Sequence, residues 1–329
     1  MGDPYDPVPI RSLLILTNPG SRQARKVRQQ LESLLADHHD RLEIHWKDVF
    51  SPSQFDQQVD RVLLVGGDGT INLGLSWLKS AGIVAPVALI PAGTGNNLAR
   101  GMGIPVAVER SIELALGTST THRIDGVDLK YDGESAGMML QVAAAGMPAH
   151  VAGRFDRLRH LPVICHPIRW SGDWIYRLLA LLTIAGQQNR EFDWQLELDG
   201  ELLEVQGAAL FFGNEGTIGG GFTPCPEARI DDGLLDVCLL PTLPFGETLR
   251  LFKQVSAGTH LEENDAVIYR QCRTVRFRQV EGPFLVDGDI RGNPQRIELE
   301  CSPGAVELVL PEGADIRPSQ QATGETELN

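Results

Sequence analysis

The residues with the clearest chemistry form one short stretch, Gly66-Gly67-Asp68-Gly69-Thr70. Glycines let the backbone adopt positive φ and come close to a ligand. Backbone amides that point out of such a turn, backed by a helix N-terminus, form a site for phosphate oxygens. Asp68 adds a carboxylate, which needs a metal ion, a proton or a hydroxyl donor to be tolerated beside phosphates. This combination indicates phosphoryl transfer rather than simple nucleotide storage.

The elements on either side of this stretch are predicted by their apolar patterns. Val62–Val65 is a run of four apolar residues, which predicts a buried strand of a parallel sheet. After the glycines, Ile71, Leu75 and Leu78 fall on one face of a predicted helix. Thr70 is expected to cap this helix.

Two more loops of the same kind are expected beside this one. The apolar run Val87–Ile90 ends in Pro91-Ala92-Gly93-Thr94-Gly95-Asn96-Asn97, and Ser12–Thr17 ends in the turn Asn18-Pro19-Gly20-Ser21-Arg22. Strand and helix patterns alternate through residue 120, which is typical of a parallel α/β sheet. Ligands of such sheets bind outside the carboxyl ends of the strands, where all three loops are expected to lie.

From Thr121 onward strand patterns dominate. Glu191 to Glu201 alternates between apolar and charged residues, which is typical of a half-exposed antiparallel strand that enters a hairpin turn. Helices are expected near Trp170–Gln187 and Gly246–Ala257, and Val306–Leu310 is expected to be the last strand. The sequence therefore predicts an α/β domain followed by a β-rich domain.

The composition excludes several classes of protein. The chain of 329 residues is long enough for two domains, and its 29 Lys and Arg against 43 Asp and Glu leave no basic surplus for nucleic acid. The five cysteines are scattered, so neither a zinc site nor a disulfide framework is expected, which fits a reducing cytosol. No signal peptide is recognised, and no apolar run reaches the roughly 18 residues of a membrane-spanning helix.

Common phosphate-binding motifs are absent from the sequence. It contains no Gly-Lys dipeptide for a Walker A loop and no Gly-x-Gly-x-x-Gly dinucleotide fingerprint. The protein-kinase motifs are absent as well. The glycine loops therefore belong to another kind of phosphate site.

The sequence resembles the diacylglycerol kinase catalytic domain family, in the superfamily that also holds NAD kinases and sphingosine kinases, and it is most similar to bacterial soluble lipid kinases. The shared motifs follow the family's order from residue 12 to about 310. Besides the three loops above, they are Gly213-Asn214, Gly219-Gly220-Gly221, Pro226-Glu227-Ala228, Asp231-Asp232-Gly233-Leu234-Leu235-Asp236-Val237 and Asp287-Gly288-Asp289.

This resemblance implies a fold of two domains with the active site in the cleft between them. The first is a phosphofructokinase-like α/β nucleotide domain, expected at residues 1–121 and completed by 304–315. The second is a β-sandwich, expected at 122–303, and 316–329 is expected to be a polar tail.

The resemblance also implies ATP and Mg²⁺ as cofactors. Asp68 would hold the catalytic Mg²⁺, and Asn96 would support its loop; the alternatives are a set of tight turns and a carboxylate at a helix start. The residues expected to bind the nucleotide are Asn18, Pro19, Gly20, Ser21, Arg22, Gly66, Gly67, Asp68, Gly69, Thr70, Ile71, Asn72, Gly93, Thr94 and Asn96.

A second, structural Mg²⁺ site is implied at Arg229, Asp232 and Leu234. Asp232 would contribute its carboxylate and the other two residues their backbone carbonyls, which are hard oxygen ligands that suit Mg²⁺. The alternative is a plain Asp-Gly hairpin turn.

The general base of the family lies in an Asp-Gly-Glu motif. The strings Asp132-Gly133-Glu134 and Asp199-Gly200-Glu201 are interpreted as hairpin turns, and the position that matches in order is Asp287-Gly288-Asp289. Asp289 is therefore the expected base, and Asp287 is a second candidate that could bind metal instead. Asp289 is one methylene shorter than Glu, and a displacement of about 1 Å can cost roughly 100-fold in rate.

The favoured function is an ATP-dependent lipid kinase, with diacylglycerol as the default acceptor. Asn97, where the family usually has Asp, and the short Asp289 motivate an alternative, a regulatory module that binds nucleotide or lipid without turnover. An NAD kinase is a third, less favoured reading.

The expected partners are a lipid alcohol and, transiently, a membrane surface. Anionic headgroups would attract a local basic stretch, although a solvated segment explains it equally well. That stretch contains Arg154, Arg157, Arg159, His160, His166 and Arg169. The protein is expected to be cytoplasmic and peripherally membrane-associated, and a homodimer is left open.

Overall fold

The chain divides into two compact units. One contains the residues up to Ile124 and the segment that begins at Gly304, and the other is Asp125–Pro303. The sequence placed these breaks after residues 121 and 303. The computed structural model describes residues 10–36, 42–50, 55–93, 95–117, 120–159, 191–218, 222–279 and 282–314.

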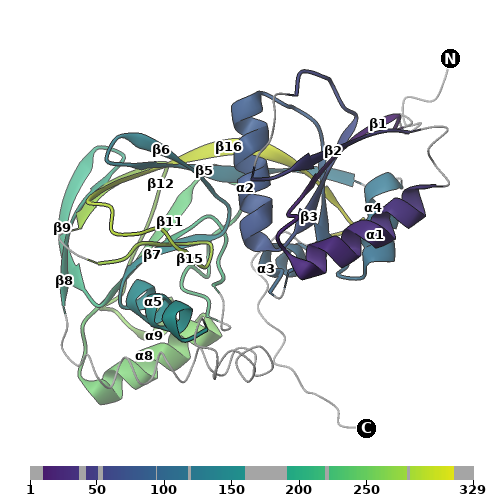
Figure 1. Ribbon diagram of the computed structural model, residues 1–329. Helices are drawn as coiled ribbons and strands as arrows, with labels where there is room; N and C mark the ends of the chain where they lie inside the picture. Colours follow the sequence, from purple (N-terminus) through teal and green to yellow (C-terminus); the bar gives the residue numbers. More distant parts are fainter. Residues whose placement is uncertain are drawn as a thin grey trace, which may run out of the picture. The chain divides into compact units, whose positions relative to one another are not determined.

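The first unit contains a parallel sheet with the strand order β2-β1-β3-β4, and the end of β16 pairs with β4 (Figure 1). Buried side chains from its strands pack against α1 and α4. The elements are β1 Ser12–Thr17, α1 Arg22–Ala36, β2 Glu43–Asp48, β3 Arg61–Gly66, α2 Asp68–Ala81, β4 Val87–Pro91, α3 Asn97–Gly101 and α4 Val108–Leu116.

Three strands of this sheet, β1, β3 and β4, are apolar and buried, whereas the edge strand β2 is mixed and has no buried position. After its first residue every position of β1 and β3 is buried, and so is all of β4. On α1, Val27, Leu31 and Leu35 repeat at intervals of four residues and are buried in the same core. The α/β fold predicted for this part of the chain is confirmed.

The second unit contains two antiparallel sheets. One has the order β12-β11-β10-β7-β14-β15, and the other includes β16-β13-β8-β9, with β5 paired to β16 and β6 paired to β5. The strands are β5 Thr120–Tyr131, β6 Glu134–Met139, β7 Val142–Gly146, β8 Phe192–Leu198, β9 Glu201–Gly207, β10 Ala209–Gly213, β11 Leu235–Leu240, β12 Ile268–Cys272, β13 Thr274–Gln279, β14 Leu285–Val286, β15 Asp289–Ile290 and β16 Arg296–Leu310.

These two sheets form a sandwich with one apolar core. Trp194 of β8 and Phe277 of β13 share a buried cluster with Phe212 of β10 and Val237 of β11. The rings of Phe212 and Phe277 stack with their centroids 5.0 Å apart. The predicted β-sandwich is confirmed.

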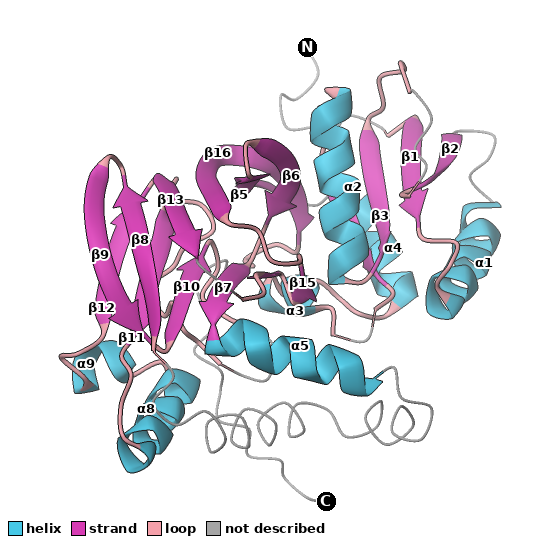
Figure 2. Ribbon diagram, turned by 60° about the vertical axis from the view of Figure 1, so that its left-hand side comes forward, coloured by secondary structure: helices cyan, strands magenta, loops and turns pink. Residues whose placement is uncertain are grey.

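Helices cover the other face of the sheet that contains β10. Ala152 of α5 (Met147–Arg159) and Leu251 of α8 (Phe245–Ala257) pack on Phe211 and Cys238. Figure 2 shows these two helices and the short α9 (His260–Glu263), which follows α8. The predicted helix at Gly246–Ala257 is thus present, whereas Trp170–Gln187 lies outside the described residues. In the described ranges, no helix combines the length and the apolar character needed to cross a bilayer.

Candidate functional site

The loop after β1 contacts the start of α2 in the first unit. Asn18 accepts a hydrogen bond from the Gly20 amide (2.9 Å) and donates one to the Thr70 hydroxyl (3.4 Å). Ser21 accepts from the Ala24 amide (3.3 Å) and so caps α1. The predicted loops after β1 and β3 therefore meet at the carboxyl edge of the sheet.

The two glycine loops touch each other through their backbones. A Cβ added to Gly93 would lie 2.5 Å from the Cα of Gly67, and one added to Gly67 would lie 2.9 Å from the Cα of Gly93. Asn96, with φ of 49°, accepts from the Gly93 amide (2.8 Å) and donates to the Gly93 carbonyl (3.1 Å). Both glycines are required because a side chain on either would push the loops apart.

The Asp68 carboxylate joins the same two loops. It is the first residue of α2, and its two oxygens accept from the amides of Asn97 and Leu98, each at 3.1 Å. Because a carboxylate offers about four lone-pair sites, two remain for a metal ion, so the oxygen donor fits Mg²⁺. Asn97 meets Asp68 through its backbone N–H, a contact that does not depend on whether residue 97 is Asn or Asp.

Not all of the predicted nucleotide residues lie on this edge in the same way. The side chains of Ile71 and Asn72 are buried, so they belong to the core of the unit rather than to the loop surface. The prediction that Thr70 caps α2 is wrong. The helix already begins at Asp68, with Gly67 as its N-cap. Thr94 and the side chain of Arg22 lie outside the described residues.

In the second unit, Asp287 and Gly288 form the two-residue turn between β14 and β15. Both have positive φ, 47° and 86°. The pairs at Asp132 and Asp199 have almost the same angles, 51° with 92° and 49° with 90°. The hairpin argument that set those two motifs aside therefore applies to Asp287 as well, and the turn alone does not single out the functional copy.

The Asp287 carboxylate holds the corner before β7. It accepts from the amides of Leu140 (2.9 Å), Gln141 (2.9 Å) and Val142 (3.1 Å). With three backbone donors on its two oxygens, Asp287 fixes the backbone rather than standing ready as a base. The Asp289 carboxylate is exposed, and within the described ranges it makes no hydrogen bond or ion pair.

An apolar cavity of about 150 Å³ lies beside this hairpin. Met147 and Val151 of α5, Phe252 of α8, Phe222 and Gly288 are among its lining residues. The hydroxyl of Thr248, which also lines it, donates to the carbonyls of Leu243 (2.8 Å) and Pro244 (3.1 Å). The cavity thus presents an apolar surface that reaches Gly288, the residue before Asp289 in the sequence, and sequence patterns showed no sign of it.

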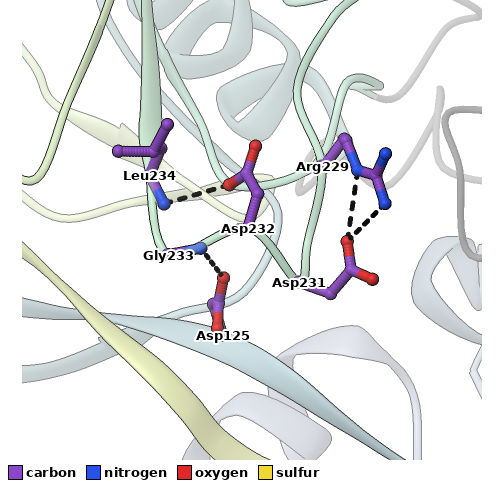
Figure 3. Close-up of polar contacts among 6 residues, drawn as sticks. All are labelled: Asp125, Arg229, Asp231, Asp232, Gly233 and Leu234. Atoms are coloured by element: carbon purple, nitrogen blue, oxygen red, sulfur yellow. Dashed lines mark hydrogen bonds and ion pairs between the residues drawn. The ribbon is translucent and has the colours of Figure 1, made fainter.

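The predicted structural metal residues share one turn (Figure 3). Asp232 accepts from the Leu234 amide (3.0 Å), Asp125 accepts from the Gly233 amide (2.6 Å), and the guanidinium of Arg229 contacts Asp231 (3.3 Å). Burial raises the pKa of Asp232, and Asp125 raises it further, so a cation would relieve this carboxylate.

The described side chains at this turn do not form a metal site by themselves. Among the described residues, no group of three or more His, Cys, Asp and Glu side chains is placed to hold a metal ion. A bound Mg²⁺ would therefore rely on the Asp232 carboxylate and on backbone carbonyls, which is the set that the resemblance implies.

Comparison with known families agrees with both units. Residues 12–129 match the diacylglycerol kinase catalytic domain, and residues 141–310 match the YegS C-terminal NAD kinase beta sandwich-like domain. The chain belongs to the diacylglycerol kinase catalytic domain family. Membership makes it a kinase of the lipid kinase type, and this much of the predicted activity is confirmed.

Named relatives of this lipid kinase cover most of its length. A diacylglycerol kinase of Mycobacterium tuberculosis is 31% identical over 253 residues, 77% of each chain. A probable YegS-like lipid kinase of Pseudomonas aeruginosa is 32% identical over 263 residues, 76% of each chain. The structure of a putative diacylglycerol kinase from Bacillus anthracis aligns with 93% of this chain and 98% of its own, with a TM-score of 0.66 and 18% identity, which supports the fold.

Two polar residues of this lipid kinase were missed at the sequence level. Glu215 and Gln141 are buried next to the Asp287 hairpin. The motif Gly213-Asn214, which the chain shares with the family, directly precedes Glu215 in the sequence. The motif does not indicate that the residue after it is buried. Gln141 meets both Glu215 and Asp287 from a distant part of the sequence, so spacing could not reveal this group.

We expect Gly93→Ala to destabilise the first unit by about 1–3 kcal/mol, since the new methyl group overlaps the Gly67 backbone. Thermal denaturation would measure this loss. Gly246→Ala, in a helix and with open space around it, serves as the control and should leave stability unchanged or raise it by up to about 1 kcal/mol. Equal effects of the two substitutions would contradict the close contact of the loops.

We expect Asp287→Asn to destabilise the second unit by about 2–3 kcal/mol, because it removes the charge that three amides bind. Asn tolerates the positive φ of this position. Asp289→Asn, two residues away and exposed, should change stability by less than about 0.5 kcal/mol. Urea denaturation of both variants tests this, and a reversed order would contradict the role of Asp287.

Proposed function

We propose that this protein is an ATP-dependent lipid kinase that transfers the γ-phosphate to the hydroxyl of a lipid alcohol, with diacylglycerol as the first acceptor to test. The observation that carries the proposal is the apolar cavity lined in part by Gly288, the residue between Asp287 and Asp289. The Mycobacterium tuberculosis relative is named a diacylglycerol kinase, which supports the choice of acceptor.

The first unit would bind the nucleotide. At the start of α2 the amides of Thr70 and Ile71 donate to the Gly67 carbonyl, which leaves those of Asp68 and Gly69 to phosphate oxygens. Asp68 would hold Mg²⁺ with the lone pairs that the Asn97 and Leu98 amides leave free. Bound Mg²⁺ would supply positive charge to the transferring phosphate group.

The second unit would bind the acceptor. An acyl chain in the cavity gains about 0.8 kcal/mol for each buried methylene, while the exposed Asp289 next to Gly288 is free to accept the hydroxyl proton. The hydroxyl oxygen forms a bond to the γ-phosphorus, and the bond from that phosphorus to the bridging oxygen breaks, with its electron pair remaining on ADP.

The nearest alternative is a module that binds nucleotide or lipid without turnover. It is favoured by the short arm of Asp289, whereas Asn97 supports it less, because Asp68 contacts the backbone of residue 97. An NAD kinase is a further outcome of the same experiment.

Contact with a membrane and a cytoplasmic location remain part of the proposal. Of the basic stretch that would meet anionic headgroups, only Arg154 has a described side chain. The side chains of Arg157 and Arg159, together with His160, His166 and Arg169, lie outside the described residues.

The test is transfer of labelled phosphate from ATP to diacylglycerol in mixed micelles with Mg²⁺, with NAD as a parallel acceptor. We expect lipid phosphorylation, a loss of about 100-fold or more in kcat for Asp68→Asn, and a comparable loss for Asp289→Ala. Asp289→Glu should retain activity because it restores the longer arm. ATP binding without transfer to any lipid alcohol would support the module instead, and transfer to NAD alone would support the NAD kinase.

The cavity makes a separate prediction about the acceptor. Ala152→Leu would fill part of the cavity from α5, so the KM for the lipid should rise by about tenfold while the KM for ATP stays unchanged. Val84→Leu, at a position that is 91% exposed, is the matched control. An unchanged lipid KM in Ala152→Leu would show that the acceptor binds elsewhere.

A further inference from the structure

Glu215 is a buried carboxyl group that the steps above do not use. It follows β10 and Asn214, and only 8% of its surface is exposed. Among its partners in the described part of the chain there is no Lys or Arg. Burying a carboxylate without a cation costs stability, so its presence here calls for a reason.

The Glu215 side chain is held by donors from two segments. The Thr217 amide donates to Oε2 (3.2 Å), and the Thr217 hydroxyl lies 2.8 Å from Oε1 and 2.9 Å from Oε2. The side chain of Gln141 is also near the carboxylate and lowers its pKa. The Thr217 amide can only donate and the Thr217 hydroxyl is placed to donate as well, so the contacts of Glu215 suit an ionised carboxylate.

Gln141 connects Glu215 to the hairpin. Its carbonyl accepts from the amides of Asn214 (2.8 Å) and Glu215 (3.1 Å), while its own amide donates to Asp287 (2.9 Å). The backbone of Gln141 is therefore hydrogen-bonded both to the segment of Glu215 and to Asp287, so a shift of one segment would displace the other. Asp287 in turn begins the turn that leads to Asp289.

Both ends of this connection reach the apolar cavity. Ile218, which follows Thr217, lines the cavity, and so does Gly288, which follows Asp287. Glu215 thus holds two segments that border the proposed acceptor site, although its own side chain does not line the cavity.

Two opposing influences act on the charge of Glu215. Burial raises its pKa, the hydrogen bonds from Thr217 and Gln141 lower it, and the nearby Asp287 raises it again, with a net increase. The thiol of Cys225 is also close enough for Glu215 to act on its pKa. Burial favours the neutral carboxyl group, whereas the ties to Thr217 and Gln141 favour the ionised one.

We propose that Glu215 is a positioning residue of the acceptor site: as a carboxylate it holds Thr217 and Gln141, and through Gln141 it fixes the hairpin that carries Asp289. Protonation turns one acceptor oxygen into a donor and releases one of these ties. Activity should then fall as Glu215 gains a proton. This inference rests on the kinase proposed above.

The kinetic test uses Glu215→Gln, which keeps the size of the side chain and removes its titration. In the wild type, kcat should fall as the pH is lowered from 8 to 5, and Thr217→Val, which lacks one donor, should shift this fall to higher pH. Glu215→Gln should have a lower kcat, no such fall, and an unchanged KM for ATP. Glu204→Gln, on the exposed surface of β9, should behave as the wild type. A wild-type kcat and pH profile in Glu215→Gln would overturn the inference.

The stability of the folded protein should depend on pH in the opposite sense to kcat. Because the pKa of Glu215 is higher in the folded protein, the stability it contributes is present at low pH and is lost as the pH rises through the folded pKa. Relative to Glu215→Gln, the wild type should therefore gain stability between pH 8 and 5 while its kcat falls. If Glu215 had a merely structural role, stability and kcat would rise or fall together with pH.

Hydrogen exchange separates this inference from the proposed kinase. After correction for intrinsic rates, peptides that cover residues 140–142 and 285–290 should lose protection in the wild type as the pH falls, and they should not in Glu215→Gln. Equal pH dependence in the two proteins would overturn the role of Glu215 even if lipid phosphorylation is found. The expected difference in a protein without kinase activity would support the tie while the proposed function fails.

Discussion

The bond between the Asp287 carboxylate and three consecutive amides is the interaction on which the second unit's candidate site depends. It fixes the corner of residues 140–142 against the hairpin of β14 and β15. From that corner, Gln141 extends the contact to Glu215, while the hairpin extends it to Gly288 and Asp289. The Asp287 side chain thereby helps to position the exposed Asp289, the border of the apolar cavity at Gly288 and the buried Glu215. All three are connected to the backbone that Asp287 binds.

The first unit relies on the same kind of contact. Asp68 spans from the loop after β3 to the start of α3, as Asp287 spans from the hairpin to the corner before β7. In both cases a carboxylate accepts from backbone amides of a segment that is distant in the sequence. Amide donors stabilise the negative charge without a cation, so the carboxylates stay in place before any ligand arrives.

Much of the fold was predictable from the sequence because its determinants are local. The buried strands β1, β3 and β4 are short apolar runs that end at glycine or proline turns, and the alternation in β8 matches a half-exposed strand. The loops at the carboxyl edge followed from the parallel topology. The link between Asp287 and Glu215 could not be predicted, because Gln141, which contacts both, lies more than 70 residues from each of them in the sequence. A hairpin turn did not distinguish Asp287 from Asp132 and Asp199, because all three begin the same kind of Asp-Gly turn.

The backbone contacts of the aspartates bear on the acidity of the chain as a whole. Amides of Arg11 and Ser12 lower the pKa of Asp60; at Asp199, burial works against the amides of Thr274 and Arg273, but the net shift is also downward. The short Asp side chain reaches such amides, whereas the longer Glu201 and Glu204 stand on the exposed surface of β9. Among the described residues, part of the negative charge behind the formal charge of −14 is therefore bound by backbone amides in turns, and part lies on exposed side chains. An engineer who wished to reduce it would replace exposed glutamates such as Glu201 and Glu204 first, because neutralising Asp60 or Asp199 would weaken the backbone contacts that these carboxylates make.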